Sequence, residues 1–173
     1  PDLTRTTFAV DLARLLAWLR REDTDGHEHW TRRAADLQSL LDRYWSDEHG
    51  FFLEPVLDAG RIRPAKTVLG FYPLLVSCVA ERRQMLLEHL ADPEQFWTTY
   101  PVPSISRDDA VFSPEGHWNN ERLERPFHGR VWPEVTSHVI DAFGGSIETE
   151  SARDRLVVTE LIDRTLRLVF ADT

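Results

Sequence analysis

Apolar residues recur at helical spacing along most of this 173-residue sequence, and this period constrains the fold more than any other feature. Two such stripes lie near the start of the chain, and the polar turn at 23–26 separates them. Two amphipathic helices joined by a short turn form an antiparallel hairpin. The expected core-facing residues are Phe8, Leu12, Leu15, Leu16 and Leu19 in the first helix, and Trp30, Ala34, Leu37, Leu41, Tyr44 and Trp45 in the second.

Four more helices are expected further along the chain. A helix over 67–80 is apolar nearly all round, which is typical of a buried helix, and its partner spans 82–90. A fifth helix follows Trp132–Pro133 and ends at Gly144–Gly145, and a sixth begins near Ser151. The six helices therefore predict three helical hairpins.

The connections between these hairpins are long and irregular. Over 51–64, a small β-hairpin turning at 59–60 is one interpretation. Residues 95–126 are rich in Pro, Ser, Asp and aromatic residues, and loops of this length are usually functional or disordered. We expect the part at 98–126 to lie over one end of an arc of hairpins. The predicted fold is all-α, with one domain over 1–173, because hairpins with such loops favour a stacked or circular array over a four-helix bundle.

The charge of the chain limits its partners. A formal net charge of −9 repels the nucleic acid backbone and anionic lipid headgroups, so neither nucleic acid nor membrane is expected as a partner. No apolar stretch approaches the roughly 20 residues that cross a bilayer. The single cysteine, Cys78, lies in the apolar run 74–79, which predicts a buried, unreactive thiol. We expect a cytoplasmic protein, with which this cysteine usage is compatible.

Five short segments are similar to segments of the (α/α)6-barrel glycosidases, especially the mannosylglycerate-hydrolase-like enzymes and their trehalase and glucosidase relatives. They occur in the family's order and cover nearly the whole chain, at 44–52, 66–74, 89–97, 100–106 and 118–133. The last segment departs from the family pattern. Relatives usually have Trp or Tyr, then Arg or Asn, then Gly-Pro before the final Trp, whereas this chain has Phe-His-Gly-Arg-Val before Trp132.

The resemblance implies a partial α/α toroid of about three hairpins, from an inverting hydrolase of α-glycosides or other small glycosides that uses no cofactor. In the family the general acid lies upstream of the part that resembles 1–50, and the general base lies downstream near the last hairpin. Inverting hydrolysis needs two carboxyl groups about 6.5–9.5 Å apart. We therefore expect this chain to be inactive by itself.

A non-catalytic function is the alternative. The chain would then be a carbohydrate-binding or scaffold segment that assembles with a partner. An open arc of hairpins is also expected to expose apolar surface on its first and last helices, and such surface favours self-association or a partner that completes the toroid.

Aromatic and cationic side chains in the loops are candidates for sugar binding. Trp97, Trp118 and Trp132 offer flat faces for stacking on a pyranose ring, and Arg130 offers two parallel N–H donors. In the resembled families the loop that carries Trp118, Arg130 and Trp132 contributes to the sugar site. Anchoring in the core is the competing interpretation for the tryptophans.

Two acidic residues are weaker candidates for hydrogen bonds to sugar hydroxyls. Asp109 follows the Pro-Ser-Ile-Ser turn, and Glu134 begins the fifth helix. Both have ordinary structural explanations, because aspartate bonds its own backbone in turns and the helix dipole favours an acid in the first turn. The sequence at 27–29, His-Glu-His, does not predict a metal site, since residues two apart on a helix point to different faces.

Overall fold

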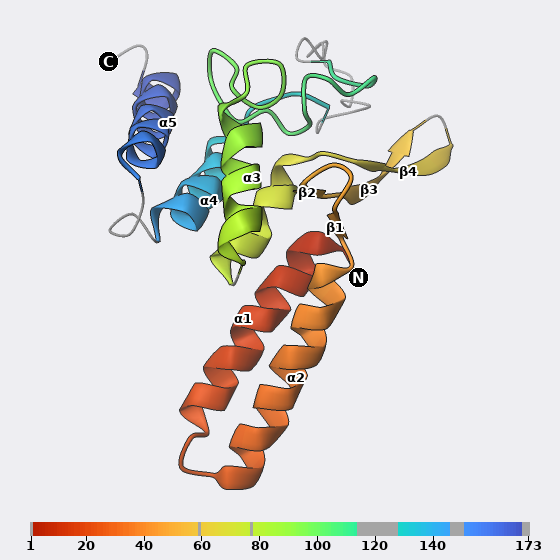
Figure 1. Cartoon of the computed structure of the whole chain (residues 1–173), viewed down its shortest axis with the longest axis vertical. Helices are drawn as coiled ribbons and strands as arrows, with labels where there is room; N and C mark the ends of the chain where they lie inside the picture. The colour runs from red at the N-terminus through yellow and green to blue at the C-terminus, as the bar shows by residue number, and fades with distance from the viewer. Residues whose placement is uncertain (1, 59, 77, 114–127, 146–150, 171–173) are drawn as a thin grey trace.

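The computed structural model describes residues 2–58, 60–76, 78–113, 128–145 and 151–170, and it is mainly helical (Figure 1). Its α-helices are α1 (Leu3–Leu19), α2 (Thr24–Asp42), α3 (Ala80–Ala91), α4 (Pro133–Gly144) and α5 (Ala152–Phe170), and a 3-10 helix, η1, spans Val68–Leu75.

The first two helices form the expected antiparallel hairpin, which projects from the rest of the molecule (Figure 1). Each helix begins at a capping aspartate. The Asp2 carboxylate accepts a hydrogen bond from the Arg5 backbone N–H at 2.8 Å, and Asp23 accepts one from Gly26 at 3.2 Å. These bonds satisfy N–H groups that have no partner within the helix, so both helix starts are defined by the sequence.

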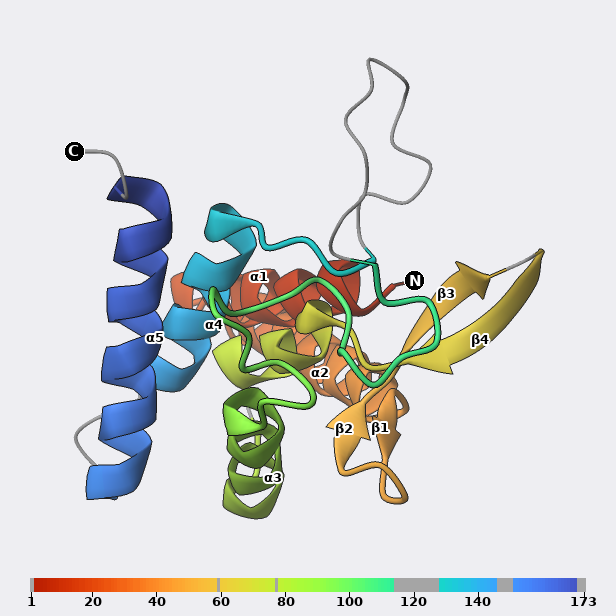
Figure 2. The ribbon, with the colours of Figure 1, turned by 90° about the horizontal axis from the view of Figure 1, so that it is seen from above.

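The helical elements form an arc of three hairpins. α1 packs against η1 and η1 packs against α4, so these three elements make up an inner layer. α2 packs on α1, and α5 packs on α4. α3 follows η1 and adds Leu86, Leu87 and Leu90 to the common core. Figure 2 shows α5 beside α4 and the strands β3 and β4 reaching out on the opposite side. This arrangement confirms the partial toroid.

The second hairpin differs from its prediction. The α-helix expected over 67–80 is the shorter 3-10 helix η1, and α3 is longer than expected because it begins at Ala80. Pro73 lies inside η1 and cannot donate a backbone hydrogen bond, which disfavours a continuous α-helix. Gly70 brings η1 close to β2, since a Cβ atom there would lie 2.6 Å from the Phe52 backbone oxygen. Close approach and the proline together explain the tighter helix.

Four short strands lie between the first and second hairpins. β1 (Trp45–Ser46) pairs with β2 (Phe51–Phe52), and β3 (Glu54–Asp58) pairs with β4 (Arg61–Ala65), both antiparallel. The second pair confirms the β-hairpin that was one interpretation of 51–64. Gly60 in its turn has a φ of 78°, a value that glycine adopts at little cost.

Phenylalanines from several parts of the chain form the centre of the core. The ring of Phe71 in η1 lies 5.2 Å from Phe51, 5.0 Å from Phe96 and 5.8 Å from Phe143, measured between centroids. This cluster joins β2, η1, α4 and the turn after α3. Cys78 is half-buried at the edge of the core, and burial raises the pKa of its thiol to about 11.

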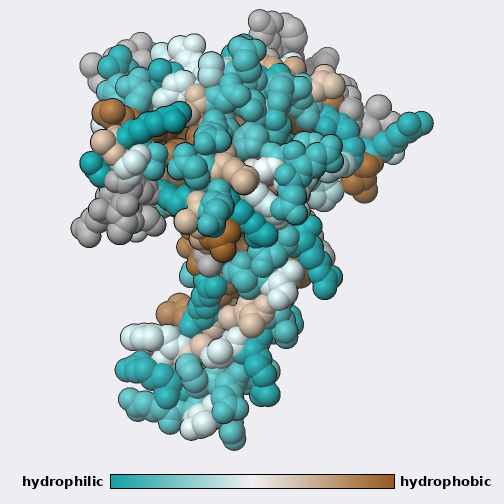
Figure 3. Space-filling model, in the orientation of Figure 1, coloured by the Kyte–Doolittle hydropathy of each residue, from teal (hydrophilic) through white to brown (hydrophobic). Residues whose placement is uncertain are grey.

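Four of the five residues expected to face the core in the first helix are instead exposed, and the fifth, Leu16, is half-buried. Leu12 and Leu19 are 58% and 57% exposed, and the same face carries Phe8 and Leu15. α1 buries a different face, rich in small residues, which allows close contact with α2. The prediction of that stripe was wrong because helical spacing does not show which face meets a partner. Figure 3 shows hydrophobic surface on the α1 side of the first hairpin and over α5. The large exposed side chains of α5 are Leu156, Ile162, Leu166, Val169 and Phe170.

Candidate functional site

The three inner elements begin at a common place, and a pocket of about 290 Å³ lies there. The first residues of η1 and of α4 line this pocket, and so does Glu54, whose carboxylate accepts a hydrogen bond from the Leu3 backbone N–H at the start of α1. We call this cavity the inner pocket. Its lining residues are Glu54, Pro55, Val56, Leu57, Thr67, Val68, Leu69, Ser104, His128, Trp132 and Val135.

Glu54 is the acidic group of the inner pocket. It is the first residue of β3 and is 8% exposed. Burial raises the pKa of its carboxyl above the ordinary value of 4.5, although hydrogen bonds from Thr67 and from the Leu3 N–H oppose this shift. The Thr67 hydroxyl donates to Glu54 Oε2 at 3.2 Å. The pocket therefore contains a buried carboxyl group that takes up a proton more readily than an exposed glutamate.

Two loops hold the other polar groups of the pocket. Ser104 donates its backbone N–H to the Arg130 oxygen at 2.8 Å, and its Oγ accepts the Gly129 N–H at 2.9 Å. The Val68 N–H donates to the Ser104 oxygen at 3.1 Å. These bonds tie the 101–106 loop to η1 and to the loop before α4. They place Ser104 and His128 beside Trp132, which lies immediately before α4.

The structure separates the residues that the sequence grouped in one loop. Trp132 lines the inner pocket, as a sugar-binding residue would. Arg130 instead lines a second, more open groove of about 570 Å³ together with Tyr100, Arg107 and Phe112. Trp118 lies outside the described residues. Trp132 and Arg130, which the sequence places in one loop, therefore line two different cavities.

The other candidates lie away from the inner pocket. Trp97 is half-buried and faces Arg164 of α5, whose Cζ lies 4.9 Å from the ring centroid. Asp109 accepts a bidentate ion pair from Arg63, and its Oδ1 accepts the Val111 N–H at 3.0 Å. Burial opposes ionisation of Asp109, but these hydrogen bonds outweigh it and hold the pKa of the carboxyl below its ordinary value. Glu134 is exposed in the first turn of α4.

Sequence reasoning missed Glu54, Ser104 and His128. Ser104 and His128 belong to the segments that carry the family resemblance, and His128 lies two residues before Arg130, but neither side chain was itself selected as a candidate. Glu54 had a weak signal, since it is a lone acid after the apolar residues Phe51–Leu53. Only the tertiary structure, in which Glu54 lies against the start of α1, shows that its carboxyl is buried.

The inner pocket combines the groups that recognise polyhydroxylated ligands. A carboxyl, two hydroxyls and an imidazole supply hydrogen bonds, and the Trp132 indole supplies a flat apolar face. Within the described ranges, no group of three or more His, Cys, Asp or Glu side chains is placed to hold a metal ion.

A helical arc whose inner elements converge on such a pocket defines a segment of an α/α-toroid carbohydrate enzyme. The family model of the mannosylglycerate hydrolase MGH1-like glycoside hydrolase domain matches residues 2–171. The chain therefore belongs to this family of glycoside hydrolases.

Solved structures and a sequence relative show how much of a complete protein the chain represents. The GH63 mannosylglycerate hydrolase from Thermus thermophilus, in complex with Tris, superposes with a TM-score of 0.65 at 24% identity, over 95% of this chain and 37% of that one. An uncharacterized conserved protein from the same organism has a TM-score of 0.65 at 25% identity, over 95% of this chain and 39% of that one. An uncharacterized protein of Borreliella burgdorferi is 31% identical over 83 residues, which are 47% of this chain and 16% of that protein. The chain thus spans well under half of each of these three proteins.

None of the helices in the described part of the chain is both long enough and apolar enough to cross a membrane.

Proposed function

We propose that this chain is the central segment of an inverting glycoside hydrolase, and that its inner pocket binds one ring of a small glycoside. The observation that carries this proposal is the convergence of Glu54, Thr67, Ser104, His128 and Trp132 where three inner elements begin. The volume of about 290 Å³ is close to the lower end of the ~300–1,000 Å³ range of small-molecule sites, which suits a single sugar ring. The Thermus mannosylglycerate hydrolase has been crystallised with glucose, which supports a sugar as the ligand.

The proposed roles follow from the chemistry of each side chain. Trp132 stacks on the apolar face of the ring, and Thr67 and Ser104 bond hydroxyl groups. Glu54 accepts a hydroxyl proton when ionised and donates one when protonated. The ligands to be tested include sugars with an acidic or glyceryl substituent.

The cytoplasm stays the expected location of the protein, because Cys78 is its single cysteine.

Catalysis is proposed to need carboxyl groups that this chain does not bring together. Among the described residues lining the inner pocket, Glu54 is the only acid. An inverting mechanism needs an acid and a base on opposite sides of the scissile bond. We therefore propose that 1–173 is a partial toroid domain that supplies substrate contacts, and that it is inactive without the rest of the ring.

A non-catalytic carbohydrate-binding or scaffold function is the second candidate. The apolar faces of α1 and α5, at the two ends of the arc, favour an assembly with other helices. Sugar binding without turnover, both alone and when the chain is joined to the flanking hairpins of a relative, would support this second function over the first.

Ligand titration tests the inner pocket directly. Calorimetry with glucose, mannose and D-glycerate should show binding by the wild-type chain, loss of binding in Trp132→Ala, and unchanged binding in Arg130→Gln, which alters the other groove. Thermal melting of each variant separates lost contacts from lost folding, because truncating a buried aromatic costs about 3–5 kcal/mol of stability. Equal loss of binding in both variants, or a Trp132→Ala variant that is destabilised but binds normally, would rule out this pocket.

An activity assay tests the proposed inactivity. We expect no hydrolysis of trehalose, α-glucosides or mannosylglycerate by the isolated chain. Robust turnover that Asp109→Asn or Glu134→Gln abolishes would show that the catalytic pair lies within the chain.

A further inference from the structure

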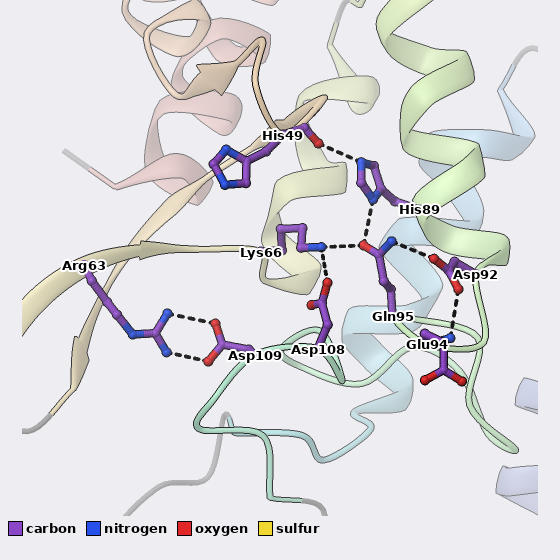
Figure 4. Close-up of polar contacts among 9 residues, drawn as sticks. All are labelled: His49, Arg63, Lys66, His89, Asp92, Glu94, Gln95, Asp108 and Asp109. Atoms are coloured by element: carbon purple, nitrogen blue, oxygen red, sulfur yellow. Dashed lines mark hydrogen bonds and ion pairs between the residues drawn. The ribbon is translucent and has the colours of Figure 1, made fainter.

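His89, in the last turn of α3, bonds two different segments through its two ring nitrogens (Figure 4). Its Nδ1 lies 2.7 Å from Gln95 Oε1, in the turn that follows α3. Its Nε2 lies 2.9 Å from the backbone oxygen of His49, in the turn between β1 and β2. The His49 carbonyl can only accept a hydrogen bond, so Nε2 of His89 carries a proton.

The orientation of the Gln95 amide decides the state of the other nitrogen. Lys66 Nζ donates to Gln95 Oε1 at 2.6 Å, and Gln95 Nε2 donates to Asp92 Oδ2 at 2.7 Å (Figure 4). A rotated amide would place its NH2 group against the Lys66 ammonium and its oxygen against the Asp92 carboxylate. Both contacts would be repulsive, so the oxygen faces His89 and can only accept.

A neutral imidazole has one N–H group and cannot donate from both nitrogens. Each His89 nitrogen nevertheless faces an acceptor. We propose that His89 is held as the doubly protonated imidazolium, and that this charged ring is a pH-sensitive clamp between α3 and the loops that support the inner pocket.

The groups around His89 are compatible with a positive ring. Asp92 faces it from the turn after α3, and its carboxylate pKa is lowered first by the Gln95 hydrogen bond and then by the Glu94 N–H, with a smaller contribution from the charge on His89. Lys66 faces the same Gln95 oxygen, but its ammonium is paired with Asp108 at 2.5 Å. The side chain of His49 bonds Ser46, and Phe51 contacts the His89 ring edge-to-face at 5.1 Å.

The clamp reaches the inner pocket through the backbone next to β4 and of the 104–109 loop. The Lys66 oxygen accepts the Ser106 N–H at 3.0 Å, and the Gln95 oxygen accepts the Arg107 N–H at 3.0 Å. Lys66 is followed by Thr67, whose hydroxyl bonds Glu54 in the pocket. Loss of the proton on Nδ1 leaves two acceptor atoms, His89 Nδ1 and Gln95 Oε1, facing each other. The Gln95 side chain must then move, and its hydrogen bond with Lys66 changes with it. The protonation of His89 is independent of the proposed function. The effect of this protonation on the inner pocket rests on the proposed function.

Nitrogen-15 NMR of the wild-type chain, labelled at histidine, tests the protonation state without any substitution. The two ring shifts distinguish an imidazolium from either neutral tautomer. From the two acceptors that face the ring, we expect the shifts of a doubly protonated His89 at neutral pH. A neutral single tautomer of His89 at that pH would overturn the proposal.

Variants test the clamp and its cause. In Gln95→Leu the acceptor at Nδ1 is gone, so His89 should lose its second proton at a lower pH than in the wild type. The thermal stability of the wild type should be lower at a pH where His89 has lost a ring proton, because one of its two hydrogen bonds to an acceptor is then lost. His89→Gln should remove this dependence, and His29→Gln should retain it.

Two outcomes of the variant experiments overturn the proposal. One is an unchanged His89 titration in Gln95→Leu, and the other is the same pH dependence of stability in His89→Gln and the wild type. Sugar titration across the same pH range tests the proposed function separately. A sugar affinity that stays constant over the pH range in which His89 loses a proton would show that the clamp does not affect the inner pocket. The result on the protonation of His89 would be unaffected.

Discussion

Glu54 combines burial with hydrogen bonds that a neutral amide can also accept. Because its folded-state pKa is raised above 4.5, the proton on Glu54 stabilises the fold fully below that value, and this contribution is lost as the pH rises through the folded-state pKa. Glu54→Gln keeps an oxygen for Thr67 and the Leu3 N–H but has no charge to bury. We expect its melting temperature to fall less than that of the wild type between about pH 4 and pH 7. Glu134→Gln, an exposed control, should follow the wild type, and parallel curves for all three chains would contradict the prediction.

Asp109 is the opposite case, because its folded-state pKa is lowered. Its contribution to stability is present above the ordinary value of 3.8 and is lost as the pH falls through the folded-state pKa. The Asp109 side chain is 8% exposed, and Asp109→Asn weakens its bonds with Arg63. Hydrogen bonds to charged groups contribute about 1.5–3 kcal/mol, so urea unfolding should show a loss of that order. Asp108→Asn, at a side chain that is 44% exposed, should cost less than about 1 kcal/mol. A loss for Asp109→Asn no larger than that of Asp108→Asn would show that the Arg63 pair is not stabilising.

At the scale of elements, the sequence predicted those whose limits are set by local chemistry. Pro133 and Gly144–Gly145 mark α4, which lies where expected, and the polar turn at 23–26 separates α1 from α2 as expected. α2 ends at Asp42, so Tyr44 and Trp45, expected in that helix, lie beyond it. The 3-10 form of η1 depends on its contact with β2, and the buried face of α1 depends on where α2 lies. Neither relation is visible in a local pattern. Trp132 was a candidate because its loop has a local sequence pattern. Glu54 was not, because its place beside the start of α1 depends on the tertiary structure.

Gly70 tests the packing of η1 on the strands. A Cβ atom at this position would lie 2.2 Å from the Phe51 ring and 2.6 Å from the Phe52 backbone oxygen. The backbone contact cannot be relieved by a side-chain rotation, so Gly70→Ala should destabilise the fold by about 1–3 kcal/mol or more. Gly144→Ala is the matched control. Its Cβ atom would meet nothing within 4 Å, and it should be neutral or stabilising by up to about 1 kcal/mol. Equal melting temperatures for the two variants would contradict the close contact between η1 and β2.

The whole molecule exposes large apolar side chains at both ends of its arc, which an isolated soluble chain rarely does. Leu12 is 58% exposed on α1, and Leu166 is 51% exposed on α5. In a closed ring both faces would contact neighbouring hairpins, so an isolated arc should bury them by self-association. Sedimentation velocity should therefore show an average mass that rises with concentration. Leu12→Glu with Leu166→Glu should lower that mass, whereas Ser39→Glu on the exposed side of α2 should leave it unchanged. A wild-type chain that stays monomeric at high concentration would show that these faces do not drive assembly.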